Sequence, residues 1–215
     1  MFENTEIKII LKPDSISWDD ISNFLRSSHE KNVENGVIMP YAQLPPEEIR
    51  QKIEGRGVMF VAMEGEQLVG TGALLFLEKD MWCGKGKFAY SCFDAVHPDY
   101  SGRGVYKAIA NTQEQYALSN GVNRIFFDTH EKNRRMIQIS KKSGYECINY
   151  RIRDDHNSIV LLKWLQDKPY THRQCYKTYM NTKLGKKYNH EEGKTISSKI
   201  NKLVLRFRLK LLKLL

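Results

Sequence analysis

The fold of this chain is decided by residues 96–106, which read Val96-His97-Pro98-Asp99-Tyr100-Ser101-Gly102-Arg103-Gly104-Val105-Tyr106. The preceding residues, 88–96, are mostly apolar and predict a β-strand, and Pro98 ends it because proline has no N–H to donate. Gly102 and Gly104 let the backbone approach a ligand closely, and the helix predicted to begin near Gly104 offers unpaired N–H groups to an anion. This pattern of strand, glycine loop and helix predicts a phosphate-binding loop.

Glycine pairs also occur in dinucleotide and nucleotide sites, but the neighbouring residues exclude both. A dinucleotide site needs a third glycine where this chain has Lys107, and a P-loop needs Gly-Lys-Ser or Gly-Lys-Thr, which this stretch lacks. A second pattern lies downstream, where Asn133 begins a predicted helix that ends at the pair Gly144-Tyr145. The order and separation of the two patterns are far more specific than either pattern alone.

Together the two patterns resemble those of the GNAT superfamily of acyl-CoA-dependent N-acetyltransferases. In that family a strand leads through V-x-P-x-Y into Q/R-x-x-G-x-G/A, and residues 101–106 take the place of the last element here. Two positions depart from the family pattern, since Ser101 replaces the usual Gln or Arg and Tyr106 replaces a small residue. The resemblance extends over residues 6–165 and leaves the rest of the chain unexplained.

The composition limits the class of protein. The 215 residues, 41% of them hydrophobic, suffice for one well-packed domain and are too few for two large ones. The four cysteines form no Cys-x-x-Cys pair, so we expect neither a disulfide framework nor a metal site. The sequence shows no secretory pattern at its start and no run of about 18 apolar residues, so we expect a cytoplasmic protein.

All of the excess positive charge lies in residues 168–215. These hold 13 Lys and Arg against two acids, whereas residues 1–167 hold 21 against 23, so nucleic acid is not an expected ligand of the first part. Within the tail, residues 196–215 place apolar and basic side chains on opposite stripes of a helix. Such a helix is typical of peripheral membrane contact, of pairing with a partner helix or a second copy, and of a cover over an apolar patch; a strand is not excluded.

The apolar pattern predicts an α/β protein with a mixed sheet. Strands are expected at 6–11, 58–63, 68–77, 88–96, 124–128, 145–153 and 158–165, and helices at 17–30, 46–53, 105–119 and 133–142. The strand–helix–strand unit over 88–128 requires a right-handed crossover between parallel strands. The resemblance implies more: a single GNAT-like domain in residues 1–167, with a mostly antiparallel central sheet flanked by helices, followed by a basic helical extension in residues 168–215.

The resemblance implies acetyl-CoA as a co-substrate and suggests its contacts. The diphosphate is expected on the N–H groups of residues 101–106, with Arg103 as an additional charge. Asn133 is expected to cap its helix and to lie near the pantetheine arm. A backbone N–H at Ala95 or Val96 is expected to polarise the thioester carbonyl, because the family's sheet opens there.

The catalytic residues expected from the family are mostly replaced in this chain. At the position of the usual carboxylate on the fourth strand stands Tyr90, which leaves Asp94 as the only carboxylate of that strand. Alternation along the strand places Asp94 on the face of Tyr90 and Cys92, so Asp94 is the expected base, with a structural role as the alternative. The usual acidic tyrosine is replaced by Ser140, a poor acid that is expected to bond its own helix, which leaves water or another tyrosine to protonate the thiolate.

The sequence therefore predicts an N-acetyltransferase that moves an acetyl group from acetyl-CoA to a primary amine by direct attack in a ternary complex. Residues 78–86, the first two helices, His130 and Glu131 are the expected acceptor-binding parts. One alternative is transfer of a longer acyl chain at a membrane surface, for which the tail is the reason. Another is an inactive acyl-CoA sensor, for which the replaced catalytic residues are the reason. The identity of the amine stays open.

Overall fold

The computed structural model describes residues 6–78, 87–152 and 157–166, and these form one seven-stranded sheet in the order β1-β2-β3-β4-β5-β7-β6. The strands are β1 (Ile7–Leu11), β2 (Gly57–Glu64), β3 (Gln67–Glu78), β4 (Lys87–Val96), β5 (Arg124–His130), β6 (Glu146–Ile152) and β7 (Asn157–Trp164). Every neighbouring pair is antiparallel except β4 and β5, which are parallel. The mixed, mostly antiparallel sheet that was expected is confirmed.

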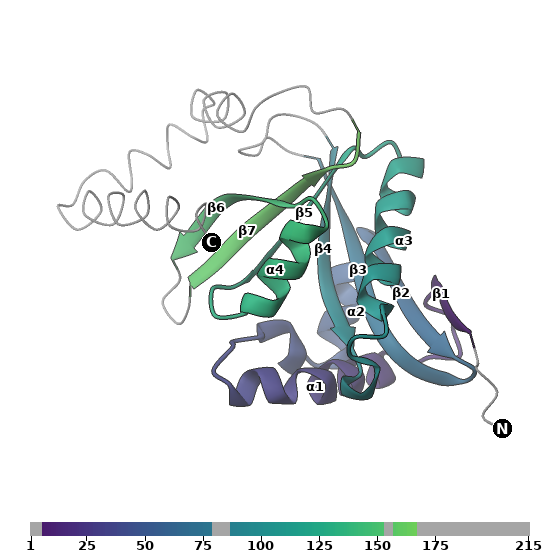
Figure 1. Ribbon diagram of the computed structural model, residues 1–215. Helices are drawn as coiled ribbons and strands as arrows, with labels where there is room; N and C mark the ends of the chain where they lie inside the picture. The colour runs from purple at the N-terminus through teal and green to yellow at the C-terminus, as the bar shows by residue number, and fades with distance from the viewer. Residues whose placement is uncertain (1–5, 79–86, 153–156, 167–215) are drawn as a thin grey trace.

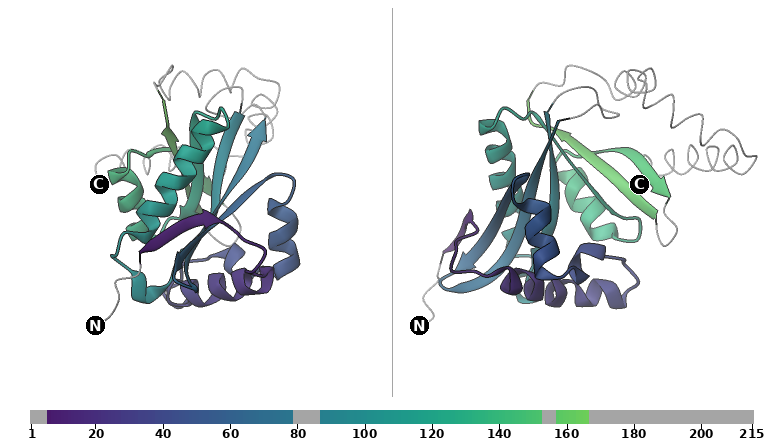
Figure 2. Two further views of the ribbon diagram at one scale, coloured as in Figure 1. Left: turned by 90° about the vertical axis from the view of Figure 1, so that its right-hand side faces the viewer. Right: turned by 180° about the vertical axis from the view of Figure 1, so that it is seen from behind.

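Helices cover both faces of the sheet. They are α1 (Trp18–Glu34), α2 (Pro46–Ile53), α3 (Val105–Ser119) and α4 (Arg134–Lys142), with short 3-10 turns η1 (Pro40–Gln43) and η2 (Pro98–Tyr100). Figures 1 and 2 show α3 and α4 against one face and α1 and α2 against the other. The crossover predicted between the parallel strands β4 and β5 is made by α3.

The helix ends follow the local signals in the sequence. The Ser17 hydroxyl accepts a hydrogen bond from the N–H of Asp20, and the Asp20 carboxylate accepts one from the N–H of Ser17, which completes a capping box at the start of α1. Gly121 and Gly144 take left-handed conformations, with φ of 72° and 87°, just after α3 and α4. These ends were predicted, whereas the extension of α1 to Glu34 was not.

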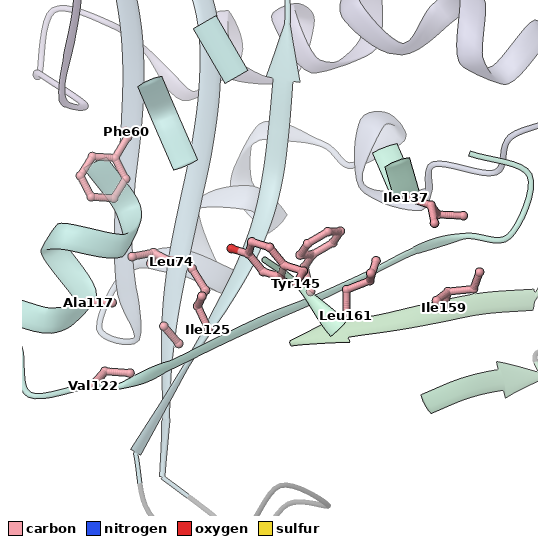
Figure 3. Packing of buried hydrophobic residues seen from close by; sticks show 11 residues of the cluster. Phe60, Leu74, Ala117, Val122, Ile125, Ile137, Tyr145, Ile159 and Leu161 are labelled. Atoms are coloured by element: carbon pink, nitrogen blue, oxygen red, sulfur yellow. The ribbon is translucent and has the colours of Figure 1, made fainter. Parts of the chain in front are cut away.

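The main core lies between the sheet and the α3–α4 layer. Figure 3 shows its side chains meeting from both halves of the sheet and from both helices; the labelled residues are Phe60, Leu74, Ala117, Val122, Ile125, Ile137, Tyr145, Ile159 and Leu161. A second cluster, which includes Ile21, Leu25 and Ile49, packs α1 and α2 against the opposite face. Because both faces are covered by apolar side chains, the sheet can hold a site only where its strands separate.

The strands β4 and β5 separate soon after they meet. Their ladder consists of Ala89 with Ile125 and Tyr90 with Phe126, although β4 continues to Val96 and β5 to His130. Figure 1 shows the two halves of the sheet diverging from this point. The second half of β4 therefore has no strand partner on its β5 side.

Several expectations fall outside the described residues. They concern most of the loop at 78–86, the turn at 153–156 and the tail at 168–215, including the amphipathic segment 196–215. In the part of the chain that the structure describes, none of the helices has the length and apolar character needed to cross a membrane.

Candidate active site

A bulge interrupts β4 where it leaves β5. One residue of β3, Gly72, lies opposite two residues of β4, Phe93 and Asp94. Phe93 has a positive φ of 56°, and the hydroxyl of Thr71 donates a 2.9 Å hydrogen bond to the Phe93 carbonyl. A non-glycine residue with positive φ is uncommon, and a bulge of this kind re-aims the side chains that follow it.

The bulge places Asp94 on the face opposite to the one expected. Strict alternation would put it beside Tyr90 and Cys92, but its carboxylate accepts hydrogen bonds from the Ser91 hydroxyl at 2.6 Å and from the Gln113 amide of α3 at 3.0 Å. Cys92 instead packs with the cluster beneath α1 and α2. The alternation argument was wrong because the extra residue shifts every later side chain of β4 to the other face.

Burial makes the Asp94 carboxyl a weak acid. It raises the pKa of Asp94 to about 7, against the opposing effect of the hydrogen bonds from Ser91 and Gln113. The space for the carboxylate comes from Gly72, because a Cβ there would lie 2.6 Å from Asp94 Oδ1 and 2.7 Å from Gln113 Nε2. The result is a half-buried group that exchanges its proton near neutral pH.

The backbone of β4 presents a donor at the opening. The N–H of His97 donates to the Val69 carbonyl of β3 at 3.0 Å. Because successive N–H groups of a strand point to opposite sides, the N–H of Val96 points toward β5, beyond the last residue pair of the β4–β5 ladder. Of the two residues expected to polarise a carbonyl, Val96 is the one whose N–H is oriented toward the opening, and Ala95 faces β3.

The glycine loop leaves room for an anion at the start of α3. Gly102 and Gly104 have φ of 85° and 84°, and a Cβ at either position would meet no atom within 4 Å. Gly104 is the N-cap of α3, with no side-chain hydrogen bond to the helix and no acidic residue in the first turn. The N–H groups that begin with Val105 are therefore available to a ligand, and an open cradle of this kind fits the CoA diphosphate.

The two arginines nearest this loop have different partners. Arg103, expected to bind phosphate, pairs with the Glu64 carboxylate at 2.9 Å, and its guanidinium lies 4.4 Å from the centre of the Tyr100 ring. Arg135 of α4 instead donates a 2.6 Å hydrogen bond to the Ser101 hydroxyl. Sequence reasoning missed Arg135, because nothing in its local pattern distinguishes it from a solvated helix residue.

Of the other residues predicted from the two motifs, Tyr106 and Ser140 meet between α3 and α4, and Asn133 joins the start of α4 to β5. Tyr106 is half-buried, its hydroxyl interacts with the Ser140 side chain, and burial raises the pKa of this phenol. Ser140 is buried and donates to the Met136 carbonyl of its own helix at 2.7 Å. Asn133 caps α4 by accepting from the Met136 N–H at 3.2 Å and donates to the Thr129 hydroxyl at 3.2 Å. The Tyr106 ring thus turns away from the glycine loop.

The opposite side of the opening carries a tyrosine that was not predicted. Tyr41 of η1 packs edge-on against the rings of His29 at 5.4 Å and Phe93 at 5.7 Å. Burial raises the pKa of Tyr41, and the nearby charge of Asp94 raises it further, so the phenol stays protonated. Burial also lowers the pKa of His29 to about 4, so the imidazole is neutral at pH 7. No motif surrounds Tyr41, so no local signal in the sequence indicated it.

The two residues expected to contact the acceptor after β5 have structural partners. His130 is buried at the end of the strand, and its Nδ1 accepts a hydrogen bond from the Lys132 N–H at 3.0 Å. The Glu131 carboxylate accepts from the Asn157 amide at 3.0 Å. The Glu131 contact ties the end of β5 to the start of β7, and the His130 contact fixes the turn that follows β5.

Comparison with known proteins identifies the fold. A profile described as the Acetyltransferase (GNAT) family matches residues 18–145. No curated protein matches the sequence.

Similar solved structures include an acetyltransferase from Streptococcus agalactiae, with 21% identity and a TM-score of 0.56, covering 76% of this chain and 99% of that one. A GNAT-family acetyltransferase from Staphylococcus aureus shows 18% identity and a TM-score of 0.59, and the match covers 75% of this chain and 100% of that one. The ribosomal-protein-S18-alanine N-acetyltransferase from Escherichia coli shows 13% identity and a TM-score of 0.55, and the match covers 77% of this chain and 98% of that one. At these identities the structural likeness is a likeness of fold.

Proposed function

This chain belongs to the GNAT acetyltransferase family, and from that premise we propose that it transfers the acetyl group of acetyl-CoA to a primary amine by direct attack in a ternary complex. The observation that carries the proposal is the opening beyond the β4–β5 ladder, which the Val96 N–H faces and which lies beside Asp94, two residues earlier on β4. A free backbone donor and a group with a pKa of about 7 are what an acyl transfer to an amine requires.

Acetyl-CoA, whose use the family implies, supplies an electrophilic thioester. The residues that would hold its diphosphate are Gly102, Gly104 and the first turn of α3, for which the left-handed glycines and the uncapped helix start are the support. Asn133 at the start of α4 lies on the far side of the opening from β4 and would face the pantetheine arm.

The Val96 N–H stabilises the charge that develops on the thioester oxygen. A backbone donor fixed in a sheet needs no reorganisation when the charge appears, and removal of one such donor typically costs about 3 kcal/mol of transition-state stabilisation in related acyl transfers. The bulge at Phe93 fixes the direction of this N–H, because it sets the register of the last residues of β4 against β3.

Asp94 takes the proton from the attacking amine through a water molecule. A water is required because the carboxylate faces α3, where Ser91 and Gln113 hold both oxygens. A base with a pKa of about 7 is ionised in half of the molecules at neutral pH and still binds the proton well. The acceptor amine then reacts in its neutral form.

Tyr106 returns a proton to the CoA thiolate. Its phenol stays protonated because burial raises its pKa, and its hydroxyl lies beside Ser140, the position that the family pattern gives to a tyrosine. Tyr106 therefore supplies from α3 the phenol that α4 lacks. Ser140 orients this phenol and keeps its own hydrogen bond to the helix.

An assay of CoA release across classes of amine tests the function. Amino sugars, amino acids, polyamines and lysine peptides would each be offered with acetyl-CoA and, separately, with a long-chain acyl-CoA. We expect turnover with acetyl-CoA and one amine class. A preference for the long-chain thioester would replace acetyl transfer by acyl transfer, and tight CoA binding without turnover for any amine would identify a sensor.

A further inference from the structure

We propose that Arg135 of α4 is the side-chain cation that binds the CoA diphosphate, in place of Arg103 within the glycine loop. The proposal rests on the proposed use of acetyl-CoA and adds a residue from outside the loop to that binding site. It also explains how a chain with serine at position 101 keeps a guanidinium beside the loop.

The Arg103 side chain already has partners outside the loop. Its guanidinium forms an ion pair of 2.9 Å with Glu64 at the end of β2 and stacks over Tyr100, whose hydroxyl also bonds Glu64. The Glu64 carboxylate thus gathers both the guanidinium and the phenol. To reach a phosphate at the loop, Arg103 would have to break the ion pair and leave the ring, and each of these contacts opposes the movement.

Arg135 has no such commitment. Its guanidinium donates the 2.6 Å hydrogen bond to Ser101, and among residues 6–78, 87–152 and 157–166 it forms no ion pair with a carboxylate. A guanidinium has five N–H donors, so the bond to Ser101 leaves others for a ligand. Because Ser101 directly precedes Gly102, the hydrogen bond to Ser101 holds the guanidinium beside the glycine loop.

The charges around Arg135 favour an anion. Arg135 lies in the first turn of α4, where the helix dipole is positive, and it touches the loop that leads into the positive start of α3. Neither α3 nor α4 has an acidic residue in its first turn, so the positive helix starts and the guanidinium repel one another without a compensating charge from those turns. A diphosphate between them would relieve this repulsion, and the guanidinium fork can bond two of its oxygens.

Calorimetric titration with CoA tests the proposal. Arg135→Gln is expected to weaken binding at least tenfold, about 1.4 kcal/mol. Arg134→Gln is the matched control, because Arg134 is the neighbouring exposed arginine of the same helix turn, and we expect its affinity to stay within twofold of the parent. Arg135→Lys, which keeps the charge and loses the fork, is expected to fall between the two.

A second ligand locates the contact. With 3′-dephospho-CoA, which retains the diphosphate, the loss caused by Arg135→Gln should be the same as with CoA. A loss seen only with CoA would place Arg135 at the 3′-phosphate and overturn the proposal, as would equal affinities of Arg135→Gln and the parent, or a larger loss for Arg103→Gln. Far-ultraviolet circular dichroism and the melting temperature establish that each variant is folded. Failure of the parent itself to bind CoA would instead contradict the proposed function.

Discussion

The Tyr90 hydroxyl donates a 2.8 Å hydrogen bond to Asp128 Oδ1 and so joins β4 to β5 just beyond the last pair of their ladder. The bond spans the strands where they begin to separate. The parallel ladder has two residue pairs, and this side-chain bond adds to the direct link between the two halves of the sheet.

Replacing Tyr90 by Phe should therefore weaken the domain. A hydrogen bond to a charged group typically contributes about 2 kcal/mol, so we expect urea unfolding to show a loss of that order. Tyr116→Phe is the control, because this half-buried tyrosine packs its ring against Phe60 and its hydroxyl forms no hydrogen bond with the residues that the structure describes. Equal stabilities of the two variants would show that the Tyr90 bond contributes nothing.

Asp94→Asn tests the proposed base through the pH dependence of turnover. The parent's rate should fall as the pH drops below about 7, where the carboxylate gains its proton. The variant should turn over more slowly, with little change in CoA affinity, and should lack this limb of the profile. A variant with the parental profile would leave Asp94 a structural role.

The same substitution makes a prediction about stability, with a sign that can be worked out. The folded-state pKa of Asp94, about 7, lies above its ordinary value of 3.8, so folding favours the protonated form. The contribution of Asp94 to stability is therefore greatest below pH 4 and is lost as the pH rises through 7, by at most about 4 kcal/mol. Asp94→Asn should remove this loss, because Ser91 can turn its hydroxyl to Gln113 Oε1, 3.3 Å away. The measurement is the free energy of unfolding of the parent and of Asp94→Asn, each determined by chemical unfolding at pH 4 and at pH 8.

Gly104→Val should weaken acetyl-CoA binding at least tenfold, about 1.4 kcal/mol, because a branched side chain would stand where the backbone meets the diphosphate. The left-handed φ adds a cost in stability that is unrelated to the ligand. Gly121→Val at the other end of α3 carries the same cost, with φ of 72° and open space around it. If both variants bind acetyl-CoA equally well, the glycine loop has no special part in binding.

Tyr106→Phe should lower the rate of the chemical step by tenfold or more, because the phenol is the proposed proton donor. Single-turnover measurements separate this step from product release. Ser140→Ala should have a smaller effect, since the serine acts on the phenol and not on the substrate. The reverse order of effects would move the acid to Ser140, and no effect of either change would leave the proton to water.

The fold could be predicted because its signals are local. Each signal depends on residues that are close in the sequence. Examples are the helix cap at Ser17, the left-handed glycines Gly121 and Gly144, and the periodic spacing of apolar residues around them. The family pattern then supplied the sheet order that local signals do not contain. The conformation of the glycine loop was predictable for the same reason, since a glycine and a helix start are adjacent in the chain.

The interior of the site could not be predicted in this way. The face of Asp94 depends on a bulge that Phe93 forms opposite Gly72, a residue on another strand. The partner of Arg103 is Glu64, which is 39 residues away in the sequence, and the contact of Arg135 with Ser101 spans 34 residues. Alternation and motif spacing carry no information about such contacts, because they are decided by tertiary packing.

Gly72 has a consequence for how the acidity of this domain can change. Any side chain there would collide with the Asp94 carboxylate and with Gln113, so the smallest possible substitution, Gly72→Ala, would push the acid toward a different environment. The pKa of Asp94 is thus controlled from a neighbouring strand, by a residue with no ionisable group. In an enzyme that uses Asp94 as its base, a change of one methyl group at residue 72 would move the pH optimum while every residue in contact with substrate stayed the same.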